Sequence, residues 1–374
     1  MAQFNRERAV VSDQTDTHAL VNLEAIRGNA RRLAGFAGKP ILAPIKADAY
    51  GHGAARVALA LEPLVWGFAV ATASEALELR AAGIVKDVLL LTPPRASSLA
   101  ALIHNGVSFV VNSLEEVALL VSEAGAQGQT VRVHLKVNTG LNRLGAAPED
   151  AAKLLLELGR HANLELIGVM THLVDSEDDG PAWATVQIER FNQFLETHRV
   201  AVPYRHAANT GGVLNRALGA HFDLIRPGIG LYGYAPGTDM ANLIHLEPAM
   251  TLRGAVIFVK DLAVGQPVSY NATWHAAADT RVATVRIGYA DGYPRSVSNR
   301  ASALLNGSRV PQIGRVCMDQ LLLEIGNLEV SVGDLVTLFG AGEITADHVA
   351  GWAGTNSYEI LTGIAARVPR VYEG

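Results

Sequence analysis

A lysine stands directly after the first apolar run of the chain, where its amine could act as a nucleophile. Residues 41–45 (ILAPI) lead into Lys46, and small, polar and aromatic residues follow it in the segment 47–53 (ADAYGHG). A single lysine is more often a solvated surface charge, but a charge at the inner end of a buried strand rarely lacks a partner. Because a desolvated lysine amine forms Schiff bases with carbonyl compounds, Lys46 is a candidate to hold a carbonyl cofactor.

Two glycine-rich turns later in the chain could bind phosphate. They are the segments 209–212 (NTGG) and 228–233 (GIGLYG). The second matches the dinucleotide pattern G-x-G-x-x-G, but it follows the eighth apolar run, and Arg253 stands where a ribose-binding acid is expected. A cradle of backbone amides for a single phosphate fits better. A lysine at one end and phosphate-binding turns at the other predict a pyridoxal phosphate enzyme.

His172 ends the sixth apolar run, three residues before Asp175. A buried histidine with satisfied hydrogen bonds is the simple interpretation, and a metal ligand is the sharper alternative. No His-x-His follows the first run and no His-Glu-x-x-His occurs in the chain, so ligands for a metal are few. We expect no metal site.

Two segments in the last third of the chain carry further candidates. The segment 288–295 (GYADGYPR) holds Tyr289 and Tyr293, and the segment 315–320 (RVCMDQ) holds Cys317. The tyrosines could simply cover a hydrophobic face, because a catalytic tyrosine must be poised against an ordinary pKa of about 10. Cys317 is expected to be a small buried hydrophobe.

Eight apolar runs carry most of these residues at their ends, and helical segments separate the runs. The runs end near Ile45, Val70, Leu91, Val111, Val137, Met170, His206 and Ile225. They are continuous rather than alternating, as expected when both faces of a sheet are buried. The alternation of strand and helix predicts an α/β fold, a (β/α)8 TIM barrel, whose active site lies at the C-terminal ends of the strands.

Local signals mark the ends of several helices. The segments 72–75 (TASE) and 113–116 (SLEE) predict capping boxes. Gly83 and Gly125 are expected to end the helices that follow, and Pro148 is expected to open another.

The pattern changes after about residue 240, where strands separated by turn signals replace helical periodicity. We therefore predict a barrel domain over 15–240 that binds pyridoxal phosphate, followed by a mainly β C-terminal domain over 241–374. The N-terminal strand within residues 1–23 is a candidate to pair with the β domain.

Composition excludes several classes of protein. The chain has 374 residues, more than a single barrel of about 250 requires. Its net charge of −5 provides no basic surface for nucleic acid or for an anionic membrane, and its single cysteine excludes an internal disulfide. No signal-peptide core opens the chain, and no apolar run approaches the ~20 residues of a membrane span. These features predict a cytoplasmic protein.

Taken together, the motifs resemble those of the alanine racemase family, a pyridoxal phosphate-dependent family of fold type III. The matching segments follow in order over essentially the whole chain: 46–53, 136–145 (KVNTGLNRLG), 226–233, 288–293, 315–320 and 358–370. Two departures are small. Thr210 replaces a usual serine, which keeps the hydroxyl, and the segment 171–178 (THLVDSED) diverges from a more alanine-rich pattern after its histidine.

The resemblance implies an isomerase that interconverts L-alanine and D-alanine with two bases. Lys46 would carry pyridoxal phosphate and move the Cα proton on one face, and Tyr289 from the other subunit of a homodimer would serve the opposite face. His172 and Arg226 would form the hydrogen-bond chain that makes Tyr289 a usable base. Two bases on different subunits can approach one planar carbanion from opposite sides.

The resemblance also implies the binding residues. Those for the cofactor are Lys46, Tyr50, His172, Asn209, Thr210, Arg226, Gly228, Ile229 and Tyr358. Arg143 and the backbone of Met318 would meet the substrate carboxylate. Arg226 would face the pyridine nitrogen, and because arginine only donates, the ring would be a weaker electron sink than with a carboxylate partner.

Lys136 is implied to be carbamylated, as N6-carboxylysine. An unmodified Lys136 would add to the cations Lys46, Arg143 and Arg226 in one cleft, which is unfavourable at low dielectric. A carbamate would instead pair with Arg143 and orient it.

Other functions remain open from the sequence. A diamino acid decarboxylase shares the barrel-plus-β architecture, and a non-catalytic pyridoxal phosphate carrier resembles the barrel alone. A binuclear metal hydrolase is a more distant alternative. The enzyme would supply D-alanine for peptidoglycan or serve alanine catabolism, with the strictness for alanine over serine undecided.

Overall fold

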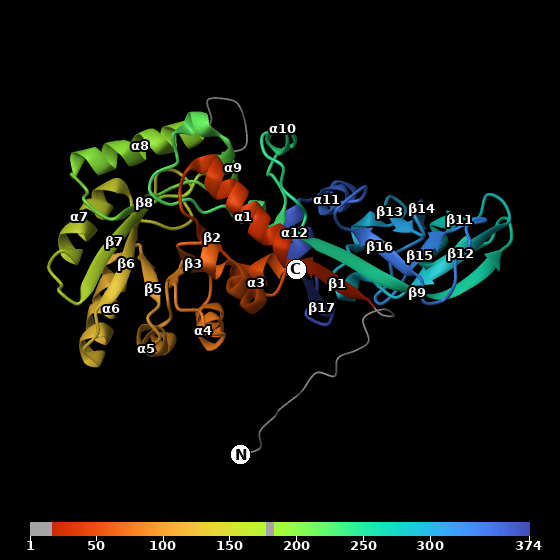
Figure 1. Cartoon of the computed structure of the whole chain (residues 1–374), viewed down its shortest axis with the longest axis horizontal. Coiled ribbons are helices and arrows are strands. Elements are labelled where there is room, and N and C mark those ends of the chain that lie inside the picture. The colour runs from red at the N-terminus through yellow and green to blue at the C-terminus, as the bar shows by residue number, and fades with distance from the viewer. Residues whose placement is uncertain (1–16, 177–182) are drawn as a thin grey trace, which may run out of the picture. The chain divides into compact units, whose positions relative to one another are not determined.

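The computed structural model describes residues 17–176 and 183–374 (Figure 1). Residues 1–16 and 177–182, which include the end of the divergent segment 171–178, lie outside the described residues. The chain divides into two compact units. One is Leu23–Glu247, and the other is Pro248–Gly374 together with the described N-terminal residues up to Asn22.

The first unit is a parallel sheet that curls into a barrel. Its seven strands pair in chain order: β2 (Leu42–Pro44), β3 (Gly67–Val70), β4 (Asp87–Leu90), β5 (Ser108–Val111), β6 (Val131–Lys136), β7 (Leu164–Met170) and β8 (Tyr204–His206). The predicted fold class is thereby confirmed.

The predicted eighth strand is wrong as a strand, because a single parallel bridge takes its place. Ile225 bridges Ile41, and Leu42 N–H donates to the Ile225 carbonyl at 2.9 Å. On the other side, Leu224 N–H donates to the Arg205 carbonyl of β8 at 3.3 Å. Pro227, which lacks an N–H, follows within two residues, so the ladder cannot continue.

Helices separate the strands. They are α1 (Leu23–Ala37), α2 (Lys46–Gly51), α3 (Ala54–Leu61), α4 (Ala73–Ala81), α5 (Ala96–His104), α6 (Leu114–Gln127), α7 (Pro148–Leu158), α8 (Trp183–Thr197), α9 (Thr210–Leu214) and α10 (Thr238–Ala241), with short 3-10 turns η1 (Glu62–Leu64), η2 (Arg216–Leu218) and η3 (Ile229–Tyr232).

The local helix signals are partly confirmed. Thr72 and Glu75 form the predicted capping box at α4, and Pro148 opens α7. Ser113 caps α6, but the Glu116 carboxylate accepts from Asn112 N–H. The expected helix end at Gly125 is wrong, because α6 continues to Gln127 and Gly128 takes the left-handed cap at φ 63°.

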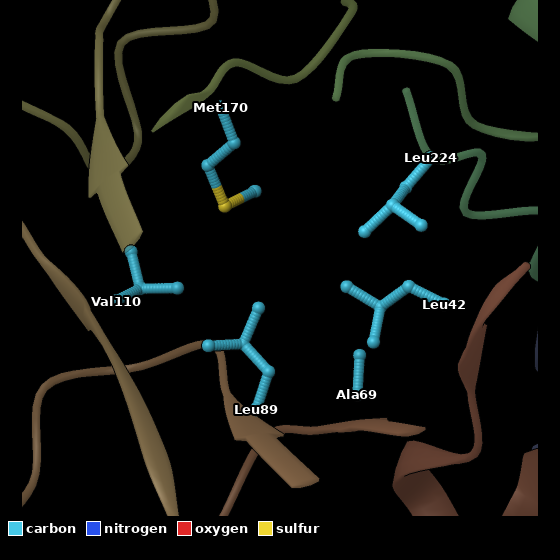
Figure 2. Packing of buried hydrophobic residues seen from close by; sticks show 6 residues of the cluster. All are labelled: Leu42, Ala69, Leu89, Val110, Met170 and Leu224. Atoms are coloured by element: carbon cyan, nitrogen blue, oxygen red, sulfur yellow. The ribbon is translucent and has the colours of Figure 1, made fainter. Parts of the chain in front are cut away.

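Apolar side chains from successive strands fill the interior of the barrel. Figure 2 shows six of them pointing toward one another, all at most 2% exposed: Leu42, Ala69, Leu89, Val110, Met170 and Leu224. Since helices cover the outer face of the sheet and side chains fill the inner face, both faces are apolar, which explains the continuous runs.

The second unit is built on an eight-stranded sheet in the order β12-β15-β14-β13-β16-β9-β1-β17. Its strands are β1 (His18–Asn22), β9 (Met250–Leu262), β12 (Thr280–Val285), β13 (Ser302–Leu305), β14 (Ser308–Ile313), β15 (Leu321–Glu324), β16 (Leu335–Phe339) and β17 (Arg370–Glu373). A small ribbon of β10 (Pro267–Val268) and β11 (Trp274–His275) accompanies it, with 3-10 turns η4 (Tyr270–Ala272), η5 (Tyr289–Asp291) and η6 (Arg295–Val297) and helices α11 (Ala346–Ala353) and α12 (Ser357–Thr362).

The early strand β1 lies inside this sheet, where it pairs antiparallel with β9 and parallel with β17. The pairing expected for the N-terminal segment is therefore present. Among the described residues, no helix is long and apolar enough to cross a membrane.

Candidate active site

Lys46 follows β2 and begins a turn of unusual backbone conformation. The next four residues, Ala47, Asp48, Ala49 and Tyr50, have φ of 53° to 54° and ψ of 40° to 51°, which is left-handed helix. For residues other than glycine this conformation costs about 1–2 kcal/mol each, and such strain persists only where surrounding contacts hold it, often at functional sites. These four positions contain no glycine or other sequence signal that predicts a left-handed turn.

The Lys46 amine is half-buried at the barrel end. Burial, followed by the positive charge of Arg143, lowers its pKa, and the charge of Glu75 acts in the opposite direction. A lowered pKa increases the fraction of neutral amine, which is the nucleophilic form.

Lys136, the last residue of β6, is 6% exposed. Burial lowers the pKa of its amine to about 8, and the charges of Arg226, Arg143 and Lys46 contribute in that order. Arg143 lies exposed in the loop after β6. The other three predicted cations, Lys46, Arg143 and Arg226, therefore lie close enough to Lys136 for their charges to lower its pKa.

Arg226 is buried, with 4% of its surface exposed, and its guanidinium is anchored from several sides. Its Nη1 donates to Nδ1 of His206 at 2.7 Å, and its Nη2 donates to the carbonyl of Thr171 at 2.7 Å and to Nδ1 of His172 at 3.3 Å. The predicted link between Arg226 and His172 is therefore present, while its continuation to Tyr289 stays a prediction. Among the described residues, neither the Nε–H of Arg226 nor its second Nη1–H has an acceptor, so these donors are left for a ligand.

A second histidine pair extends inward from Arg226, and sequence reasoning missed it. His206 Nε2 and His134 Nδ1 lie 2.8 Å apart in the barrel core. Burial, and then the charge of Arg226, lowers the pKa of both rings, that of His134 to about 3. The only sequence signal is that both histidines occupy buried strand positions, at the end of β8 and two residues before Lys136.

The two glycine-rich turns approach Tyr50 and each other. A Cβ at Gly228 would lie 2.4 Å from the Tyr50 hydroxyl oxygen, so only glycine allows this approach. Gly230 N–H donates to the Thr210 hydroxyl at 3.2 Å. Burial raises the pKa of Tyr50 to about 12, which keeps its phenol protonated as a donor.

Several backbone and side-chain donors gather at these turns. Asn209 caps α9, with its Oδ1 accepting from Gly212 N–H at 2.9 Å. In the part of the chain that the structure describes, the N–H groups of Gly211 and Ile229 donate to no acceptor. Together with the hydroxyls of Tyr50 and Thr210, these groups form a donor-lined cradle that suits a phosphate.

Tyr289, Met318 and Tyr358 belong to the β unit, whereas the other predicted site residues belong to the barrel unit. The backbones of the first two lie side by side, because Tyr289 N–H donates to the Cys317 carbonyl and Ala290 N–H to the Met318 carbonyl, both at 3.0 Å. Cys317 is half-buried, so the expectation that it is a small buried hydrophobe is wrong. Tyr358 lies on α12.

A further tyrosine, Tyr270, was missed from the sequence. With Met318 and Cys317 it lines a cavity of about 410 Å³, and its side chain is 67% exposed. Its neighbours Ser269 and Asn271 have left-handed φ of 64° and 63°, which is a strained way to present a side chain. A tyrosine between two very short strands is the weak sequence signal that could have indicated it.

Comparisons with known proteins agree over both units. The family model of the alanine racemase N-terminal domain matches residues 21–236, and that of the C-terminal domain matches residues 249–372. An alanine racemase of Deinococcus deserti is 40% identical over 96% of this chain and 99% of its own length, and one of Deinococcus radiodurans is 42% identical over 94% and 97%.

Solved structures give the same result. The alanine racemase of D-cycloserine-producing Streptomyces lavendulae superposes with a TM-score of 0.91 at 35% identity, covering 96% of this chain and 97% of its own. The biosynthetic alanine racemase of Pseudomonas aeruginosa does so with a TM-score of 0.87 at 36% identity, covering 96% and 100%. The chain therefore belongs to the alanine racemase family and is an amino-acid racemase, an isomerase.

Proposed function

We propose that this protein interconverts L-alanine and D-alanine with pyridoxal phosphate held by Lys46, and that it works as a homodimer with shared active sites. The observation that carries the proposal is the position of Lys46: a half-buried amine of lowered pKa, at the same barrel end as a donor-lined cradle and a buried arginine. The identity of the substrate is inferred from relatives that are named alanine racemase.

The residues of the barrel unit fit this cofactor. Lys46 would bind its aldehyde carbon, and the cradle of Tyr50, Thr210, Gly211 and Ile229 would bind its phosphate. Asn209, Gly228 and, in the β unit, Tyr358 are further predicted contacts. When bound, pyridoxal phosphate withdraws electrons from the substrate and so acidifies its Cα proton.

Arg226 is the residue that we assign to the pyridine nitrogen. Its Nε–H and second Nη1–H have no acceptor among the described residues, and its other donors fix the guanidinium to His206 of β8 and to the segment after β7. Because arginine does not give up a proton, it leaves the nitrogen unprotonated, which limits electron withdrawal and disfavours side reactions such as transamination.

Two bases would move the proton at Cα from opposite faces. Lys46 serves one face, and a tyrosine of the other subunit serves the second. Tyr289 is the candidate from the sequence, with His172 and Arg226 tuning its phenol. Tyr270 is a second candidate, favoured by its place in one cavity with Met318. The backbone N–H of Met318 donates to no acceptor among the described residues, so it is available for the substrate carboxylate.

Arg143 would bind the same carboxylate, oriented by a carbamate on Lys136. With its pKa lowered to about 8, Lys136 has a larger neutral fraction near neutral pH than an ordinary lysine. The neutral amine adds to carbon dioxide and releases one proton, which leaves an anionic carbamate that can accept from Arg143. The crowding of cations at this barrel end is thereby reduced.

We further propose a cytoplasmic role, either in supplying D-alanine for peptidoglycan or in alanine catabolism. The single cysteine supports the cytoplasmic placement, and similarity to the biosynthetic alanine racemase of Pseudomonas aeruginosa supports a biosynthetic role.

Exchange of the Cα proton with solvent deuterium tests the function. L-Alanine and D-alanine should each exchange and interconvert, only when pyridoxal phosphate is present, and faster than L-serine. Consumption of L-lysine with release of carbon dioxide would indicate the diamino acid decarboxylase instead. Absence of exchange with every amino acid would indicate a cofactor carrier.

A further inference from the structure

The carboxylate of Glu75, in the first turn of α4, accepts hydrogen bonds from three backbone N–H groups. Its Oε2 accepts from Ala71 at 2.8 Å and from Thr72 at 2.9 Å, the latter as part of the capping box. Its Oε1 accepts from Ala47 N–H at 2.6 Å. That third bond is not part of helix capping, because Ala47 lies 28 residues earlier in the chain.

The N–H of Ala47 belongs to the peptide bond that joins Lys46 to the left-handed turn. Hydrogen bonds to this peptide restrict the backbone rotation that aims the Lys46 side chain. Farther along the turn, Ala54 N–H donates to the Asp48 carboxylate at 2.7 Å, and the Tyr50 ring stacks on Tyr232 with centroids 4.8 Å apart. At the Lys46 end of the turn, the side chain of Glu75 holds the backbone through Ala47 N–H.

Glu116 provides an internal comparison. Like Glu75 it is the third residue of a helix capped by a hydroxyl residue, and its carboxylate accepts from the backbone just before that cap, at Asn112. Its side-chain bonds stay within its own helix start, at Asn112. The additional bond of Glu75 to the strained turn is therefore not a general property of these capping glutamates.

We propose that Glu75 is a positioning residue for Lys46, tying the strained turn after Lys46 to the N-terminus of α4 so that the amine is held for the cofactor. This inference rests on the proposed function. The carboxylate also contributes to the charge around the amine, where the charges of Arg143, Lys136 and His172 interact with Lys46 as well. Glu75 and Asp48 both lie near a further carboxylate, that of Glu78.

Cofactor affinity gives the first test, measured on the dimer by equilibrium dialysis against pyridoxal phosphate. Glu75→Ala should weaken binding roughly tenfold, because a charge-assisted hydrogen bond to the lysine peptide is lost. Glu116→Ala, the matched control, should lower thermal stability through loss of its helix cap but leave cofactor affinity unchanged.

Glycine at the strained position should rescue the variant. Gly adopts positive φ without strain, so Ala47→Gly in the Glu75→Ala background should recover part of the lost affinity. If Glu75→Ala acted only by removing a helix cap, Ala47→Gly would not restore cofactor affinity.

The pH dependence of cofactor loading gives a second test that does not depend on Glu75→Ala being stable. Glu75→Gln keeps an acceptor oxygen but removes the negative charge, which raises the pKa of Lys46 in the native protein. Without that charge the amine is neutral at lower pH, so the midpoint of loading should shift to lower pH, with no shift in Glu116→Gln.

Equal cofactor affinity and equal loading midpoints in the Glu75 and Glu116 variants would overturn the inference and leave Glu75 as a helix cap. Failure of the native protein to bind pyridoxal phosphate at all would instead overturn the proposed function, so the two failures are distinguishable.

Discussion

Arg226 Nη1 donates to Nδ1 of His206 across 2.7 Å, and this bond determines which nitrogen of His206 carries a proton. Arginine has donors only, so Nδ1 must accept and the neutral ring is protonated at Nε2. That Nε2–H then donates to His134 Nδ1, which leaves the proton of His134 on Nε2, a buried atom without a partner among the described residues. The guanidinium thus orients the neutral ring of His206 directly and that of His134 through His206.

These histidines predict a specific loss of stability in acid. Burial lowers the folded-state pKa of His134 from 6.5 to about 3, so below pH 6.5 the unfolded chain binds a proton that the folded chain does not. The free energy of unfolding should therefore fall as the pH falls through this window. Denaturant unfolding of His134→Gln, which can still accept from His206, should show a shallower dependence on pH than the native protein. The exposed His104→Gln is the control, and an unaltered slope in His134→Gln would contradict the assignment.

Replacing Arg226 should change which reaction occurs. Arg226→Glu places a carboxylate at the proposed position of the pyridine nitrogen, which raises the proton affinity of that nitrogen and strengthens electron withdrawal. Racemisation should slow roughly a hundredfold while the ratio of pyruvate formed to alanine racemised increases. Arg226→Lys retains a donor and should keep the native ratio. If the ratio in Arg226→Glu equals that of the native enzyme, the electron-sink argument is wrong.

The identity of the second base can be read from two matched variants. The phenylalanine variant of the true base should lose roughly 10²–10⁴-fold in racemisation, as general acid–base groups contribute. Tyr270→Phe should show this loss if the cavity shared with Met318 is the substrate site, and Tyr289→Phe if the sequence-based prediction is right. Comparable, near-native rates in both variants would exclude a tyrosine base.

Mixed dimers extend this measurement to the shared site. Lys46→Ala and the inactive tyrosine variant should each be nearly inactive alone, but a dimer of one with the other contains one site with both bases intact. Activity should return on subunit exchange. If the two bases came from the same chain, every site would carry one lesion, and mixing would restore nothing.

Lys136 is expected to carry a carbamate in the native protein. Because its pKa is lowered to about 8, the neutral amine becomes more abundant as the pH rises through that value, and uptake of carbon dioxide should rise with it. Carbon-13 bicarbonate should give a carbamate resonance that is missing in Lys136→Ala, and a short carboxylic acid should restore part of that variant's activity. A fully active native enzyme without the resonance would contradict the proposal.

The strand ends were predictable because buried parallel strands have continuous apolar sequences. Of the eight predicted strands, the first seven are present at the positions of these apolar runs. The sequence did not show that the eighth apolar run forms a single bridge instead of a strand. That outcome depends on Pro227, which cannot donate a backbone hydrogen bond, and on pairing of Ile225 with Ile41. The left-handed residues after Lys46 carry no glycine, so their conformation follows from tertiary contacts such as Glu75. The His134–His206 pair and the cavity at Tyr270 likewise join residues that are far apart in sequence, so local sequence patterns could not predict these contacts.

The most direct test of the account is to identify the residue that holds the cofactor. Borohydride treatment of the enzyme with bound pyridoxal phosphate should abolish its visible absorption and leave a stable phosphopyridoxyl group, which peptide mass spectrometry can locate. The lowered pKa of the Lys46 amine and its place beside the phosphate cradle predict the group on the peptide containing Lys46. Its appearance on Lys136, or on neither lysine, would contradict the account.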